Sequence, residues 1–225
     1  MAVETDPPLE ILRKALKIAQ QMGDYRFSGD VAVSIALYLM KEKKFSLAER
    51  LLKMAREFYQ LDKRPDALKH SRVRLIEAQG VLAWQRGNKK RAREILHRAR
   101  YHALADHSYL LFRVDQSLSH LLEEEGQLKD SLLYAKEAYN AAAASGFHRD
   151  RALGLQRLYE LYRALGKMEE AYLALEAALV VARRLRDTEM IQKLLDLRKK
   201  LLQVYTPEEK PEAPRGESPS PQPAA

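Results

Sequence analysis

The chain has 225 residues, of which 46% are hydrophobic and 31% charged, and this balance is typical of a folded globular protein rather than a disordered one. It contains no cysteine, which excludes disulfide bonds, thiolate nucleophiles and cysteine-ligated zinc. The net charge is +8, residues 1–8 lack the order of a secretory signal, and no apolar run approaches the ~20 residues that cross a bilayer. We therefore expect a cytoplasmic protein without a membrane contact.

Proline and glycine divide the chain into predicted helices. No proline lies between residues 66 and 206, and no sustained alternation of apolar and polar residues indicates a strand. Asp6 is the expected N-cap of the first helix, with Pro7 in its first turn. In chain order we predict a disordered start at 1–8, a lone helix at 9–22, four helix pairs at 29–61, 66–105, 107–145 and 149–186, a capping helix at 188–204 and a disordered, proline-rich tail at 205–225.

Glycine recurs at the turn inside the predicted pairs. Gly87, Gly126 and Gly166 each lie five residues before a small residue at which the two helices of a pair would cross. Lys43 occupies the same place in the first pair. Because a glycine can adopt a positive φ, we expect it to end the first helix of its pair at this point.

A short phrase of the form Leu-x-x-Ala recurs along the chain, with Ala in place of Leu in its fourth copy. Its last residues, separated by steps of 40, 44, 39 and 40 residues, are Ala15, Ala55, Ala99, Ala138 and Ala178. A fixed step in this range is typical of a solenoid, in which each helix pair buries its apolar face against its neighbours. The repeat therefore predicts an all-α fold, an α-solenoid of antiparallel helix pairs that ends in a capping helix.

The repeated segments resemble the tetratricopeptide repeat family. The last copy reads Gly166-Lys167-Met168-x-x-Ala171-x-x-x-Leu175-x-x-Ala178, which matches the turn, the small residues and the large residue of that family's pattern. The step of about 40 residues, rather than the usual 34, is similar to a long-helix subtype of the family. The resemblance implies a right-handed superhelix whose first helices line a concave groove that binds a segment of another protein.

The resemblance also indicates which side chains would line this groove. The expected contacts, on the first helices of the second, third and fourth pairs, are Arg74, Glu77, Arg113, Gln116, His120, Gln156, Arg157 and Glu160. The arginines offer forked donors for carboxylates, and the glutamines can bond a peptide backbone. The alternative is that these residues pair with one another or are simply solvated. Trp84, the only tryptophan, is expected to pack between adjacent repeats rather than to anchor a peptide.

Positive charge is concentrated in the second predicted pair. From residue 60 to 100 the chain has twelve Lys or Arg residues against four Asp or Glu residues, a surplus of +8. Three interpretations stay open: a solvated helix face, a site for an acidic protein, or a phosphate-binding surface. The last would make the chain a nucleic-acid- or transcription-associated regulatory factor, which is the alternative function. The basic patch comprises Arg86, Lys89, Lys90, Arg91, Arg93 and Arg98.

The sequence offers no pattern typical of an enzyme. It has no Gly-x-Ser-x-Gly elbow and no glycine-rich phosphate loop, and one Glu-x-x-His match at Glu94 and His97 falls short of a metal-binding set. We therefore expect no catalytic residue, no metal and no cofactor. The leading hypothesis is a protein-binding scaffold or adaptor that binds a peptide segment or a helix of its partner. This segment is acidic if the basic patch is the site that binds it. The sequence does not decide whether the protein forms a homo-oligomer.

Overall fold

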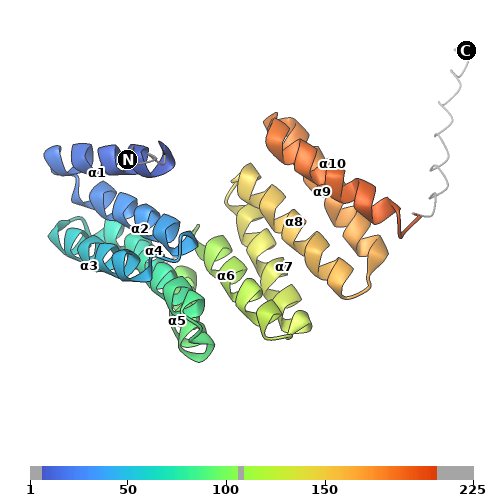
Figure 1. Cartoon of the computed structure of the whole chain (residues 1–225), viewed down its shortest axis with the longest axis horizontal. Helices are drawn as coiled ribbons and strands as arrows, with labels where there is room; N and C mark the ends of the chain where they lie inside the picture. The colour runs from blue at the N-terminus through green and yellow to red at the C-terminus, as the bar shows by residue number, and fades with distance from the viewer. Residues whose placement is uncertain (1–6, 106–108, 207–225) are drawn as a thin grey trace, which may run out of the picture.

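The protein is all-helical and forms an α-solenoid. The computed structural model describes residues 7–105 and 109–206, and these ranges contain no strand. Figure 1 shows the helices following one another in chain order from one end of the molecule to the other. The ten helices of the described ranges are α1 (Pro7–Gln21), α2 (Tyr25–Lys41), α3 (Phe45–Leu61), α4 (Pro65–Gln85), α5 (Lys89–Ala105), α6 (Leu111–Glu124), α7 (Leu128–Ala144), α8 (His148–Ala164), α9 (Met168–Leu185) and α10 (Thr188–Leu202).

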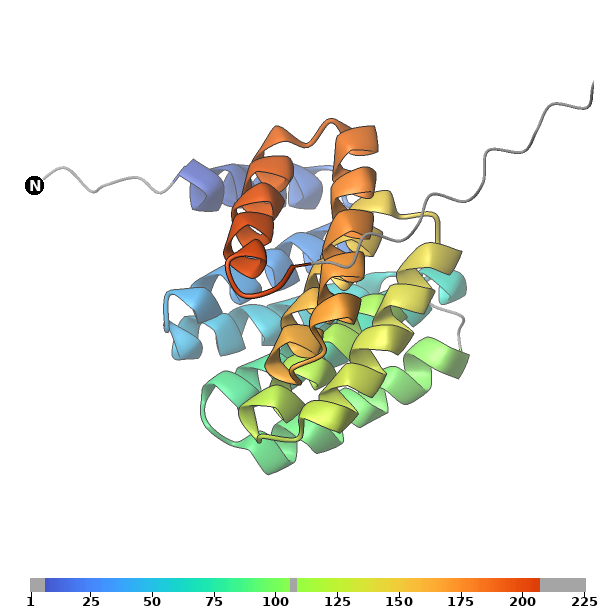
Figure 2. The same cartoon turned by 90° about the vertical axis from the view of Figure 1, so that its right-hand side faces the viewer.

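The helices pack in antiparallel pairs, α2 with α3, α4 with α5, α6 with α7 and α8 with α9. The second helix of each pair then packs on the first helix of the next pair, while α1 covers α2 and α10 covers α9. Figure 2 shows that the helix axes turn progressively along the stack, since α9 and α10 stand at a steep angle to α2 and α3. Contacts are therefore local along the chain, as expected for a solenoid.

Left-handed residues end helices where the sequence predicts a turn. Gly87, Gly126 and Gly166 have φ values of 84°, 75° and 73°, and Lys43 adopts 56° without a glycine. After Gly87 the chain closes a Schellman turn, because the N–H of Asn88 donates to the Ala83 carbonyl oxygen at 3.0 Å. The prediction that these four positions end the first helix of each pair is confirmed.

Small residues lie at the helix crossings, as the repeated phrase predicts. Ala55, Ala99 and Ala178 are fully buried, and Ala138 is 1% exposed. Alanine has almost no side chain beyond Cβ, so two helices can approach closely at these points. Larger apolar residues then fill the space on either side in clusters that follow one another along the stack.

Three helices begin two to four residues away from the predicted boundaries, which is within the expected uncertainty of such boundaries. Helix α1 begins at Pro7 rather than at residue 9, and α6 begins at Leu111 rather than at 107. Helix α2 begins at Tyr25 rather than at residue 29, because the Asp24 carboxylate caps it by accepting the N–H of Phe27 at 3.1 Å. The predicted N-cap Asp6 lies outside the described residues, as do residues 1–6 and 207–225 of the predicted disordered segments 1–8 and 205–225. The remaining residues of these segments are ordered, because 7–8 belong to α1 and Tyr205 packs against Tyr172.

Helix α10 ends the described stack. Leu194 and Leu201 are fully buried against α9, while Leu202 is 40% exposed on its free side. The helix is capped by Asp187, whose carboxylate accepts the N–H of Met190 at 3.0 Å. Within the described ranges, none of the helices combines the length and apolar character required to span a membrane.

Candidate functional site

The first helices of the pairs carry the side chains that the sequence singles out. We call the surface formed by α2, α4, α6 and α8 the first-helix surface. Its polar residues do not stand alone, because three sets of hydrogen bonds and ion pairs link each first helix to the preceding one. We call these sets rungs.

The first rung joins α4 to α2. The Arg74 Nη2 donates to Ser34 Oγ at 2.7 Å, and its Nη1 lies 3.7 Å from Asp30 Oδ1. The Tyr59 hydroxyl, from α3, donates to the same Asp30 oxygen at 2.8 Å. Arg74 is therefore half-buried and engaged by its own chain, with only 21% of its side chain exposed.

The second rung joins α6 to α4. The Arg113 Nη2 lies 3.4 Å from Glu77 Oε2, and the Ser117 hydroxyl donates to the other Glu77 oxygen at 3.3 Å. Glu77 is buried, with 5% of its surface exposed, so its carboxylate belongs to the interior of the stack. Arg113 keeps 35% of its side chain exposed, and the long distance to Glu77 leaves most of its donors available.

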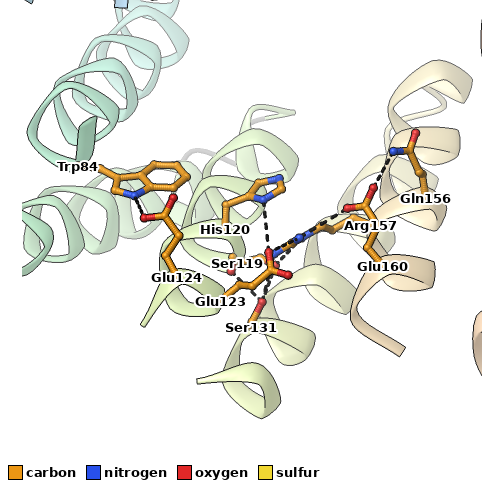
Figure 3. Close-up of polar contacts among 9 residues, drawn as sticks. All are labelled: Trp84, Ser119, His120, Glu123, Glu124, Ser131, Gln156, Arg157 and Glu160. Carbon is orange, nitrogen blue, oxygen red and sulfur yellow. Dashed lines mark hydrogen bonds and ion pairs between the residues drawn. The ribbon is translucent and has the colours of Figure 1, made fainter. Parts of the chain in front are cut away.

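The third rung is the most deeply buried and centres on Arg157 of α8 (Figure 3). Its Nη1 donates to Glu123 Oε2 at 2.6 Å, its Nε to Ser119 Oγ at 3.1 Å and its Nη2 to Ser131 Oγ at 3.3 Å. Glu160 adds a carboxylate at 3.6 Å. With only 4% of its side chain exposed, Arg157 is a buried cation that is neutralised by acids and bonded by hydroxyls.

The rungs correct part of the predicted contact set. Arg157 and Glu77 are interior residues of the stack and are removed from the set of exposed partner contacts. For these two residues the alternative holds, namely that the polar side chains of this surface pair with one another. The repeat length explains why they pair. Because each pair adds about 40 residues, side chains 36 to 40 positions apart face each other on adjacent first helices, as Arg113 faces Glu77 and Arg74 faces Ser34.

Helix α6 presents the predicted contacts that remain accessible. Arg113, Gln116 and His120 follow one another at intervals of three and four residues, which places them on one face of α6. All three are partly exposed, and 41% of the His120 side chain is accessible. On the neighbouring α8, Gln156 donates to Glu160 Oε1 at 2.7 Å, and both side chains reach the same surface.

Trp84 lies beside this stripe and links adjacent repeats (Figure 3). Its indole N–H donates to Glu124 Oε2 at 2.8 Å, and its ring stacks on His120 with 6.5 Å between the ring centroids. It also packs against the apolar cluster between α4, α5 and α6. The prediction that Trp84 packs between repeats is therefore confirmed. Burial, aided by the positive charge of Arg157, lowers the pKa of His120, which favours its neutral imidazole.

A second buried acid lies on the other side of α6, where the sequence predicts nothing. Asp115 is fully buried and its Oδ1 accepts a hydrogen bond from Arg100 Nε at 2.7 Å, while its Oδ2 has no partner among the described residues. Arg100 also pairs with Glu137 of α7. Burial raises the pKa of Asp115 to about 7, and the positive charge of Arg100 opposes this rise without cancelling it. The cluster joins α5, α6 and α7.

The predicted basic patch divides into two groups. Lys89 and Arg93 turn toward the end of α6, where Lys89 Nζ lies 3.4 Å from Glu124 Oε2 and Arg93 pairs with Glu125. Lys90 is exposed and belongs to neither group. The remaining members, Arg86, Arg91 and Arg98, line a hollow of about 930 Å³ between α3, α4 and α5.

Two basic residues that the sequence interpretation missed complete this hollow. Lys53 and Arg56 of α3 line it opposite α5. The signal was present, since Glu49, Lys53 and Arg56 are spaced four and three residues apart and therefore share one face of a helix. We call the hollow the basic channel and define it by Lys53, Arg56, Arg86, Arg91 and Arg98.

The protein is thus an α-solenoid with two candidate binding surfaces, the first-helix surface and the basic channel.

No protein-family model matches the chain, and no curated protein matches it. Among solved structures, the chain is similar to the crystal structure of BtubC (BKLC) from P. vanneervenii, with a TM-score of 0.61 and 15% sequence identity over 94% of this chain and 97% of that one. At this identity the likeness shows the fold alone.

Proposed function

We propose that the protein is a scaffold that binds a segment of another protein on the first-helix surface, with α6 at the centre of the contact. The observation that carries this proposal is the partly exposed stripe of Arg113, Gln116 and His120, which stands beside rungs that hold the neighbouring side chains in place. The resemblance of the sequence to tetratricopeptide repeats supports the same function. That resemblance, the cytoplasmic location and the absence of catalysis stay predictions.

The rungs favour binding because they order the surface before the partner arrives. A side chain that is already fixed loses less conformational entropy on binding, and each immobilised long side chain otherwise costs about 0.5–1.5 kcal/mol. Arg113 is oriented by Glu77 yet keeps donors for a partner carboxylate, to which a guanidinium can make two parallel hydrogen bonds. Gln116 can bond the partner's backbone, and neutral His120 can both donate and accept a hydrogen bond.

Affinity capture from the native source tests this proposal. The chain is immobilised as wild type, as Arg113→Glu and as a control, Lys129→Glu, which makes the same charge change at an exposed site on α7. We expect a protein retained by wild type and by the control but lost with Arg113→Glu. The retained protein is then purified and titrated against all three by calorimetry. Equal affinity for Arg113→Glu would contradict the assignment of α6 as the contact.

The alternative function, binding to nucleic acid, draws its support from the basic channel. Two observations weaken that support. The described residues that line the channel include no aromatic side chain on which a base could stack, and they include Glu49 and Glu94, which repel phosphates. Moreover, Lys89 and Arg93 of the predicted patch are already paired with acids.

A further inference from the structure

The basic channel is a groove lined by three helices, α3, α4 and α5. Helices α3 and α5 both pack on α4 and scarcely touch each other, so a space of about 930 Å³ stays open between them. The channel belongs to the second helices α3 and α5 and is separate from the stripe on α6.

The channel carries a net positive charge. Five basic residues line it against two acidic ones, a surplus of three positive charges. One pair is internal, because Arg86 Nη2 donates to Glu49 Oε2 at 2.8 Å, and Arg86, Lys53 and Arg91 together lower the pKa of Glu49. In the part of the chain that the structure describes, Lys53, Arg56, Arg91 and Arg98 have no acidic partner within ion-pair distance.

The base of the channel is apolar. Leu52 of α3, Leu82 of α4 and Ile95 of α5 line it below the charged rims. Leu52 and Leu82 are 3% and 7% exposed, so Ala83 and Ile95, which are partly exposed, supply most of the apolar surface that a ligand could reach on this base, which we call the floor. A ligand that offers negative charge to the rims and apolar groups to this floor complements the lining, and an amphipathic acidic segment that lies in a groove has this pattern.

The spacing of the basic side chains determines how far apart the carboxylates of such a ligand must be. Arg91 and Arg98 are seven residues apart on α5, or about two helical turns and ~10 Å along the axis. The partner carboxylates would be separated by a similar distance, seven residues apart in a helix or about three in an extended segment. Gln79 and Asn88 lie in the same lining and can bond a backbone.

We propose that the basic channel between α3 and α5 binds an acidic, amphipathic segment of another protein. The floor, where Ala83 and Ile95 are partly exposed, takes its apolar side chains, and Arg56, Arg91 and Arg98 take its carboxylates. This is a second binding site, independent of the first-helix surface, and it gives the scaffold two faces. A phosphate backbone fits less well, because it has no apolar side to cover the floor.

Fluorescence anisotropy with defined probes tests this inference. The first probe is a labelled amphipathic peptide of about 14 residues, or four helical turns, with glutamates two turns apart and leucines along the intervening face. The second has the same composition with its leucines scattered around the helix. The third is a labelled single-stranded oligothymidine of about 20 nucleotides. Each is titrated at ~50 and ~200 mM salt.

The variants separate a specific channel from general attraction to a basic protein. The test variant is Arg56→Glu/Arg91→Glu/Arg98→Glu, and the matched control is Lys129→Glu/Arg184→Glu/Lys193→Glu, which lowers the net charge equally at exposed positions on other helices. We expect the test variant to bind the first peptide about 30-fold or more weakly, and the control to stay within about twofold of wild type. Circular dichroism confirms that each variant keeps its helical content. If the test variant does not fold, Arg56→Gln/Arg91→Gln/Arg98→Gln replaces it, with an expected loss of about fivefold.

Four results would overturn the inference. One is equal weakening by the test and control variants, which indicates attraction to net charge alone. Another is equal binding of the two peptides, which removes the role of the floor. A third is tighter binding of the oligothymidine, lost in the test variant, which makes the channel a nucleic-acid site. The last is no binding of any probe by the wild type. Because Arg113→Glu is expected to leave the first peptide bound, failure here is distinguishable from failure of the proposed function.

Discussion

Replacing Glu123 with alanine tests the claim that the third rung neutralises a buried cation. Arg157 has 4% of its side chain exposed, and Glu123 Oε2 accepts from its Nη1 at 2.6 Å. Removing one partner of a buried pair typically costs about 3–5 kcal/mol, because the other charge is left uncompensated. Since Glu123 itself is 35% exposed and Glu160 remains 3.6 Å away, we expect about 2–3 kcal/mol for Glu123→Ala.

The double variant Glu123→Ala/Arg157→Met separates a lost interaction from a stranded charge. Methionine keeps much of the arginine stem's volume, and the hydrogen bond that Ser131 Oγ donates to the Ser119 carbonyl oxygen at 2.7 Å does not depend on an Arg157 atom. We therefore expect the double variant to regain about 2 kcal/mol relative to Glu123→Ala.

Urea unfolding followed by far-ultraviolet circular dichroism measures these free energies, with Glu124→Ala as the control. Glu124 is the next residue on α6, where its side chain is 52% exposed, pairs with Lys89 and accepts the Trp84 indole N–H, so we expect the loss of these two exposed contacts to cost about 1 kcal/mol. Equal denaturant slopes are required for the comparison, because a solenoid can unfold in steps. The reasoning is refuted if Glu123→Ala costs no more than the control, or if adding Arg157→Met makes it worse.

Two further predictions concern the interior. Asp115 has a pKa raised to about 7 by burial, above its value of about 3.9 in an unfolded chain, so the folded state binds the extra proton and stability should fall by a few kcal/mol as the pH rises from 4 to 8. Relative to Asp115→Asn, the denaturant midpoint of the wild type should decline across this range; parallel curves would contradict the assignment. A Cβ added at Gly29 would lie 2.3 Å from the Tyr59 ring, whose hydroxyl is held by Asp30, so Gly29→Ala should lower the unfolding free energy by about 1–3 kcal/mol despite alanine's higher helix propensity. Thermal melts should show this loss, and a Tm equal to that of the wild type would show that the ring moves freely.

Features that depend on a few neighbouring residues were predictable from the sequence. The turns at Gly87, Gly126 and Gly166 follow from glycine's access to positive φ, and the buried alanines follow from a repeated phrase. The predicted start of α2, at residue 29, is four residues too late. The structure shows that Gly29 is inside the helix, where its missing side chain makes room for Tyr59.

The roles of the charged side chains were not predictable in the same way. Arg157 meets Ser119, Glu123 and Ser131, which lie 26 to 38 residues away in the chain. Whether these residues meet depends on how adjacent pairs are rotated, and the repeat period does not specify that rotation. The same holds for the basic channel, because the stretch of positive charge around residue 90 is divided between two faces of α5 only once α3 and α6 are in place.

Site-specific photo-crosslinking tests the central claim most directly. Benzoylphenylalanine is placed at Gln116, in the stripe on α6, or at Leu133 of α7, which is 54% exposed on a second helix. The account predicts a discrete covalent adduct with another protein from position 116 in the native source, its loss when Arg113→Glu is added, and no such adduct from position 133. The same adduct from both positions, or an adduct at 116 that persists with Arg113→Glu, would contradict it.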